Sequence, residues 1–273
     1  NNIKTKDFPL FREDCFFTDD TVMTCAVTEA IMNGGHQDDF IDAMKKYGKL
    51  YPDAGYGARF SSWINSDNRE PYNSFGNGSA MRVSPCAWLM DCGFCARTGM
   101  TPSTRKLARL SAEVTHNHPE GIKGAMATTD AIFLCRYYFG GYCGDYEQPI
   151  NDNPTECKRQ IKDYIEQEYG YNLSQTLDEI RPNYRFNETC QETVPQAIIA
   201  FLESFDFGIY RAELATDHGQ AFIDEGSCTD SDAFLIVHDI VIIRTDQDIQ
   251  EILGTIHVLI LHGQIDDRCI LVC

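Results

Sequence analysis

The sequence has no apolar run that approaches the roughly 18 residues needed to cross a bilayer, so we expect no membrane-spanning helix. Basic residues are scarce: 23 Lys and Arg face 41 Asp and Glu, which gives a net charge of −18. A surface this acidic repels phosphate backbones and anionic lipids, which argues against nucleic-acid and membrane partners. Hydrophobic residues still make up 43% of the 273 residues. The chain can therefore bury a sizeable core, and disorder along most of its length is excluded.

The start of the chain lacks a charged segment followed by an apolar stretch, so we expect no secretion signal. Under that expectation, the 12 cysteines are reduced thiols of a cytoplasmic protein rather than a disulfide framework.

Apolar residues recur at helical spacing through the first three quarters of the chain, which predicts a mainly helical protein. A stretch rich in Gly, Asn and Ser between Gly55 and Gly78 is expected to be a long loop. Pro85 must start or kink its helix, Ser103 is a plausible N-cap, and Pro195 is tolerable in a first turn. The expected helices follow Thr18 until Gly34, run from Phe40 to Gly48, surround Met81–Leu89, run from Ser103 to Val114 and from Ile122 to Gly140, surround Ile161–Ile165, and run from Val194 to Leu202.

The last 66 residues, 208–273, differ in composition from the rest. They hold no Lys, three Arg and 12 acidic residues, so they contribute half of the net charge. They also contain 12 Ile, in runs that suit either buried strands or buried helix, and periodicity does not separate the two.

Two adjacent carboxylates, Asp19 and Asp20, follow Thr18 where a helix is expected to begin. One interpretation is helix capping, because hydroxyls cap helix starts and acids favour their positive end. The other is a site for Mg²⁺ or Ca²⁺, which prefer carboxylate and hydroxyl oxygens and offset the repulsion between neighbouring acids. A second acid pair, Asp230 and Asp232, could converge on one cation or form a solvated turn.

The segment Gly76-Asn77-Gly78-Ser79 is the second candidate site. Glycine lets backbone N–H groups approach a ligand closely, and a following helix would direct its N-terminus at a phosphate. The alternative is an ordinary Asn-Gly turn with a Ser cap.

Two histidines, His116 and His118, follow the helix expected to end near Val114. They could bind a ligand or a metal, or they could serve only the helix dipole. Cys92 and Cys95 upstream raise a structural zinc site as an alternative hypothesis, although the His-x-His spacing suits such a site poorly.

Taken together, these motifs resemble the ADP-ribosylglycohydrolase family. The family shows a Thr-Asp-Asp-Thr-x-Met segment, a Gly-Asn-Gly-x-Ala-Met-Arg segment and a Thr-His-x-His-Pro segment, which match residues 18–23, 76–82 and 115–119 here. The stretches Glu192–Ala197 and Phe201–Ser204 also match, so the resemblance covers about residues 11–207.

The resemblance implies an all-α fold, a single compact orthogonal helical domain over 1–273 in which 208–273 match poorly. It also implies hydrolysis of the bond joining ADP-ribose to a protein side chain or small acceptor. The expected enzyme is a monomer that holds two Mg²⁺ ions. By position, Thr18, Asp19, Asp20, Asp230 and Asp232 would be metal ligands, and the first two aspartates would be catalytic. Gly76, Asn77, Gly78 and Ser79 would hold the diphosphate, with His118 near the ligand.

The proposed chemistry has a physical basis: departure from ribose C1 builds oxocarbenium-like charge, and cations can orient the ribose diol and activate a water. Two departures from the family pattern support a second hypothesis, a catalytically impaired ADP-ribose-binding module. The family's opening Gly-rich helix with its site Glu has no counterpart in this sequence, and the closing Gly-Gly-Asp-Ser-Asp-Thr motif is replaced by Cys228–Ala233.

Overall fold

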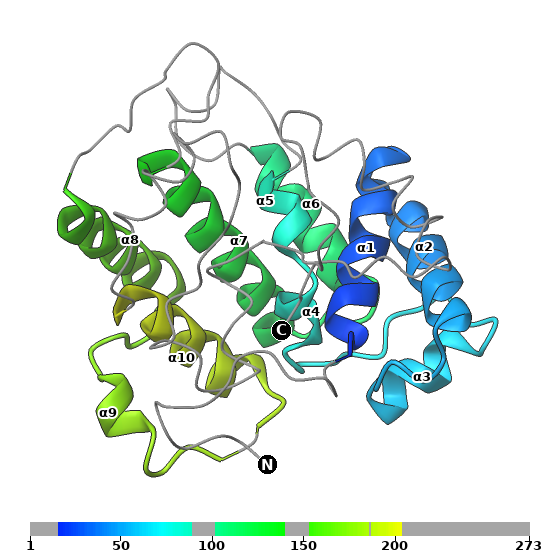
Figure 1. Cartoon of the computed structure of the whole chain (residues 1–273). Coiled ribbons are helices and arrows are strands. Elements are labelled where there is room, and N and C mark those ends of the chain that lie inside the picture. Colours follow the sequence, from blue (N-terminus) through cyan, green and yellow to red (C-terminus); the bar gives the residue numbers. More distant parts are fainter. Residues whose placement is uncertain (1–15, 89–101, 140–152, 186, 204–273) are drawn as a thin grey trace.

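The computed structural model describes residues 16–88, 102–139, 153–185 and 187–203, and within these residues the protein is built from helices (Figure 1). This confirms the expected all-α class for the described part of the chain. Gly76 and Thr189 form an isolated β-bridge. The helices are α1 Asp19–Met32, α2 Gln37–Leu50, α3 Ala58–Ile64, α4 Gly78–Met81, α5 Ser84–Trp88, α6 Pro102–Glu113, α7 Pro119–Phe139, α8 Pro154–Tyr169, α9 Leu177–Ile180 and α10 Cys190–Glu203.

Helix α1 ends where the sequence predicts, at a pair of glycines. Gly34 and Gly35 hold φ values of +133° and +70°, which residues with a β-carbon rarely adopt, so the helix cannot continue past them. Their backbone N–H groups donate to carbonyls of the last turn of α1, at 3.1 and 2.9 Å. The turn is tight enough for α2 to pack back along α1.

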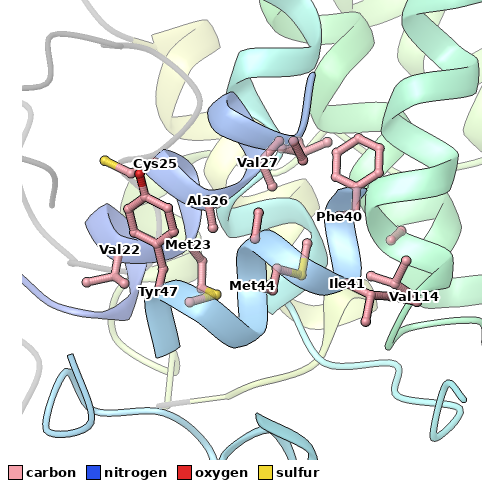
Figure 2. Close-up of a cluster of buried hydrophobic side chains, with 14 of the residues drawn as sticks. Val22, Met23, Cys25, Ala26, Val27, Phe40, Ile41, Met44, Tyr47 and Val114 are labelled. Carbon is pink, nitrogen blue, oxygen red and sulfur yellow. The ribbon is translucent and has the colours of Figure 1, made fainter. Parts of the chain in front are cut away.

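The first core lies between α1 and α2 (Figure 2). Phe40, Met44 and Tyr47 recur along α2 at helical spacing and are all but inaccessible to solvent. Each large apolar side chain that is fully buried contributes roughly 1.5–3 kcal/mol to stability. Val22, Met23 and Val27 of α1 complete this cluster, so the packing fixes the orientation of the first turn of α1.

A second core gathers around α7, which also contacts α4, α5, α6, α8 and α10. Small residues on α7, including Ala127 and Ala131, allow neighbouring helices to approach closely, and Ile161 and Phe201 from α8 and α10 fill the space between. Figure 1 shows α7 in the middle of the described helices, with α8 and α10 on one side. The central helix therefore links both cores.

Two expectations about element boundaries are wrong. Gly48 lies inside α2 rather than ending it, and it is needed because a β-carbon there would approach Ile64 Cδ1 to 2.5 Å. The expected long loop between Gly55 and Gly78 contains α3, whose two buried residues Trp63 and Ile64 are too few to show a periodic stripe.

Two capping expectations are also corrected. Ser103 lies inside α6, because Pro102 already occupies its first position. Pro195 is the sixth residue of α10 rather than part of its first turn, because the helix begins at Cys190. The expected helix around Met81–Leu89 is split into α4 and α5, and Pro85 lies in the first turn of α5.

Residues 208–273, including Asp230 and Asp232, lie outside the described residues, as do Cys92 and Cys95. The choice between strands and helix for this acidic segment therefore stays a prediction. Among the described helices, none combines the length and the hydropathy that spanning a bilayer would require.

Candidate functional site

The acid pair lies in the first turn of α1. The Asp19 backbone N–H donates to the Ala54 carbonyl at 2.8 Å, which ties the start of α1 to the loop after α2. The Thr18 hydroxyl donates to Asp20 Oδ2 at 2.6 Å. Thr18 is the N-cap residue, but its side chain makes no capping hydrogen bond to the helix backbone. Capping alone therefore does not account for this cluster of oxygens.

The two carboxyl groups are electrostatically strained. Burial, followed by the adjacent charge of Asp20, raises the pKa of Asp19 to about 7. Burial also raises the pKa of Asp20, although the hydrogen bond from Thr18 opposes this. No Lys or Arg of the described segments forms an ion pair with either carboxylate. The pair therefore lacks a positive partner from the described part of the protein.

The donor chemistry around this pair fits a hard divalent cation. The hydroxyl oxygens of Thr21 and Tyr56 are buried, and no described residue forms a hydrogen bond with either. Burial, followed by the charge of Asp19, raises the pKa of Tyr56. Oxygen ligands of this kind suit Mg²⁺ and Ca²⁺ rather than a soft metal. Within the described ranges, however, no group of three His, Cys, Asp or Glu side chains gathers. Asp19 and Asp20 could therefore supply two carboxylates of such a site, and further ligands would have to come from elsewhere.

The glycine segment is held from one side by the residues that lead into α10. The Asn77 backbone N–H donates to the Glu188 carbonyl at 2.7 Å, and the Cys190 N–H donates to the Phe75 carbonyl at 3.0 Å. The Cys190 thiol donates to the Gly76 carbonyl at 3.1 Å. No local pattern predicts this contact, because the partners lie more than 110 residues apart in the chain.

The other side of the glycine segment is held by residues 115–117. Asn73 adopts a φ of +54° and donates its backbone N–H to the Asn117 side chain at 2.8 Å. The Ser74 N–H donates to the Thr115 carbonyl at 3.3 Å. The Gly76 N–H is used within the segment, since it donates to the Ser74 hydroxyl at 3.1 Å.

Ser79 points into the protein rather than toward a ligand. Its side chain is inaccessible to solvent, and its hydroxyl donates to the Gly121 carbonyl at 2.8 Å. The contribution of Ser79 to a phosphate site would therefore come from its backbone N–H at the start of α4. Asn77, Gly76 and Gly78 are partly exposed.

His116 lies directly beneath the glycines; the sequence named both histidines as candidates, and the resemblance placed only His118 near the ligand. A β-carbon on Gly76 or Gly78 would lie 3.5 or 3.6 Å from His116 Nε2. Only 5% of the residue is exposed. Burial, followed by the charges of Arg82 and Arg59, lowers the pKa of its imidazole well below 6.5. The His116 ring is therefore neutral at physiological pH.

His118 lies at the start of α7, where its Nδ1 accepts from the Glu120 backbone N–H at 3.1 Å. Its ring contacts the Phe75 ring edge-on, with centroids 5.3 Å apart. Phe75 is 41% exposed although it is large and apolar. Phe75 directly precedes the glycine segment in the sequence, but this position alone does not predict that its ring is exposed.

The structure brings together the three motifs that the sequence singled out. Helix α4 contacts both α1 and α7, and Figure 1 shows it beside the first turn of α1. The Thr18–Asp20 segment, the glycine segment and the two histidines therefore lie at one end of the helical assembly. Of the residues expected at the zinc site, only His116 and His118 are described, and each already uses its Nδ1 in a hydrogen bond.

Comparisons with known proteins agree with this arrangement. The family model for ADP-ribosylglycohydrolase matches residues 3–223, which is wider than the span of the motifs. ADP-ribosylhydrolase ARH3 from Homo sapiens is 30% identical over 228 residues, covering 71% of this chain and 60% of that protein. ARH3 from Mus musculus is 31% identical over 139 residues, covering 45% of this chain and 35% of that protein. The matches span less than two thirds of the length of these relatives. Because the family model covers most of the sequence, the chain belongs to the ADP-ribosylglycohydrolase family.

Proposed function

We propose that this protein hydrolyses the glycosidic bond that joins ADP-ribose to a protein side chain or a small acceptor, and that the reaction depends on Mg²⁺. One observation carries the proposal: a buried pair of carboxylates without a described positive partner lies beside a glycine segment at the same end of the helices. Family membership and the ARH3 relatives support the same reaction.

Asp19 and Asp20, with Thr18, would hold the metal, and we propose both aspartates as catalytic residues for that reason. When bound, Mg²⁺ would orient the ribose hydroxyls, lower the pKa of a water and offset negative charge. The carboxylates themselves provide a negative environment that favours the positive charge developing at ribose C1. Asp230 and Asp232 remain proposed ligands that would complete the set.

The glycine segment is proposed to bind the diphosphate of ADP-ribose. Gly76, Asn77 and Gly78 are accessible, and the absence of side chains on the glycines allows close approach to the backbone. His116 would present Nε2 to a ligand oxygen at this place. His118, and the exposed ring of Phe75 beside it, would border the bound nucleotide, because an aromatic face suits a flat base.

Release of ADP-ribose from an ADP-ribosylated protein tests the proposal. We expect release in Mg²⁺, loss of release in EDTA, and loss of release in the double variant Asp19→Asn/Asp20→Asn. The exposed residue Asp53 offers a matched control, since Asp53→Asn makes the same chemical change outside the acid pair. Release that persists in EDTA, or in the double variant, would contradict the proposal.

A second candidate function is a binding module that holds ADP-ribose without hydrolysing it. One observation favours it: the closing motif of the family is altered at Cys228–Ala233. Calorimetry with ADP-ribose would identify such a module by binding without turnover of any ADP-ribosyl substrate.

The cellular setting is also a proposal. Cys25, Cys86 and Cys190 form no disulfide with a described residue, which supports a reducing, cytoplasmic location. We also propose a monomer, which light scattering after size exclusion would test, and the acidic sequence argues against a nucleic-acid partner.

A further inference from the structure

The two nitrogens of the His116 ring have different surroundings. Nδ1 lies 2.7 Å from the Thr115 hydroxyl oxygen. Nε2 faces the glycine segment, and no described residue forms a hydrogen bond with it. The nitrogen that carries the proton therefore determines whether the ring offers a ligand a donor or an acceptor.

Arg82 determines how the Thr115 hydroxyl is used. Its guanidinium is buried in the protein, 1% exposed, and no described carboxylate pairs with it. Its Nη2 donates to the Thr115 hydroxyl oxygen at 2.7 Å and to the Ser111 carbonyl at 2.8 Å. A guanidinium has only donors, so the Thr115 oxygen must accept in this contact.

The Thr115 hydroxyl hydrogen then needs an acceptor of its own. In the described part of the chain, His116 Nδ1 is the atom within hydrogen-bond distance of that hydroxyl that can accept. If Nδ1 accepts, it carries no hydrogen, and the proton of a neutral imidazole must be on Nε2.

The surroundings also disfavour a charged ring. A second proton would have to be placed on Nδ1, against a hydroxyl already oriented by Arg82. Arg82 and Arg59 both oppose positive charge on His116, and burial removes the solvent that would stabilise it. The remaining titratable group that faces the ring is Tyr72, whose ring centroid lies 6.1 Å away. Its phenol stays neutral, because burial raises its pKa.

We propose that Arg82 and Thr115 are positioning residues that fix His116 as the Nε2–H tautomer, so that the site offers a hydrogen-bond donor beneath Gly76 and Gly78. The ligand group that this arrangement recognises is an acceptor oxygen, of a phosphate or a sugar hydroxyl, rather than an N–H group. That the oxygen belongs to ADP-ribose rests on the proposed function.

The tautomer can be measured without any assay of activity. In ¹⁵N-labelled protein near neutral pH, the His116 ring signals are those that disappear in His116→Gln, and we expect them to show a protonated Nε2 and a bare, hydrogen-bonded Nδ1. A His116 ring protonated at Nδ1, or at both nitrogens, would overturn the proposal.

Two substitutions at Thr115 separate the hydroxyl from the shape of the side chain. Thr115→Val keeps the shape but removes the hydroxyl, and we expect signals from both tautomers of His116 and ADP-ribose binding weakened on the order of tenfold, the worth of one hydrogen bond. Thr115→Ser keeps the hydroxyl and should preserve the single tautomer and nearly the wild-type affinity. Equal weakening in both variants, with an unchanged tautomer, would show a structural role only.

The outcomes distinguish this inference from the proposed function. If the ring has the Nε2–H form and Thr115→Val changes it, but the wild-type protein does not bind ADP-ribose, the tautomer assignment stands and the proposed function fails. If the wild-type protein binds ADP-ribose while its His116 is protonated at Nδ1, the inference fails and the function stands. Melting temperatures of the variants identify any loss of folding.

Discussion

Replacing Asp20 with Asn should stabilise the metal-free protein, which is unusual for a change in a buried cluster. The substitution removes the charge that repels Asp19, and the amide oxygen can still accept from the Thr18 hydroxyl. The pKa of Asp19 rises from 3.8 to about 7. At about 1.4 kcal/mol per pKa unit, the ionised group costs at most about 4 kcal/mol above neutral pH. Burial is the larger cause and repulsion the second, so Asp20→Asn should recover about 1–2 kcal/mol.

The sign of the stability change caused by Asp20→Asn depends on pH and on the metal. A raised carboxyl pKa means that the folded protein binds more protons than the unfolded chain between about pH 4 and 7, so this group lowers stability as pH rises through that interval. The gain from Asp20→Asn should therefore be largest at pH 8 and fade below pH 7. In saturating Mg²⁺ the order should reverse, because binding stabilises the wild type and not the variant.

Urea unfolding in EDTA and in Mg²⁺ measures both effects. Asp53→Asn, an exposed carboxylate on the loop after α2, is the control and should change stability little in either condition. Two results would refute the reasoning: a variant less stable than the wild type in EDTA at pH 8, or an equal gain of both proteins in Mg²⁺.

Three further predictions concern the surroundings of the site. Because native His116 stays neutral, its contribution to stability should fall by about 1.4 kcal/mol between pH 7.5 and 5.5; this loss is read in urea unfolding as the difference between wild type and His116→Gln, since the opposite effect of Asp19 is present in both proteins. Arg105→Leu should destabilise by about 3–5 kcal/mol, because the Asp130 side chain is 0% exposed and loses its ion pair at 2.7 Å; adding Asp130→Asn should recover part of the loss. Gly121→Ala would put a β-carbon 2.8 Å from a backbone carbonyl and should cost about 1–3 kcal/mol, whereas Gly57→Ala, with open space around it, should cost little; an equal melting temperature for both would contradict the packing argument.

The long helices could be predicted because their burial pattern is periodic. Phe40, Met44 and Tyr47 mark one face of α2 in the sequence as clearly as in the structure. The wrong boundaries arise where packing overrides a local preference. Gly48 disfavours helix by itself, but Ile64 from α3 occupies the space that a side chain would need. Contacts between residues of different helices determine such boundaries, and a local sequence pattern does not reveal those contacts.

The candidate site was predicted in part. Asp19, Asp20 and the glycine segment could be found because their motifs occur in the order that one family shows, whereas each motif alone would be weak. His116 was named as a candidate but could not be preferred over His118, because two histidines separated by one residue look equivalent in the sequence. The structure distinguishes them, since His116 faces Gly76 and Gly78 whereas His118 Nδ1 binds the first turn of α7. Burial of Arg82 beside Thr115 was also beyond sequence reasoning, because a charged residue is usually exposed.

The central claim is that Asp19 and Asp20 hold divalent cations beside a bound sugar. Crystals grown with ADP-ribose and Mn²⁺, which substitutes for Mg²⁺ and scatters anomalously, test it most directly. We expect anomalous density in contact with both carboxylates and the ribose hydroxyls. ADP-ribose bound at Gly76–Ser79 with no ion at either aspartate would contradict the account.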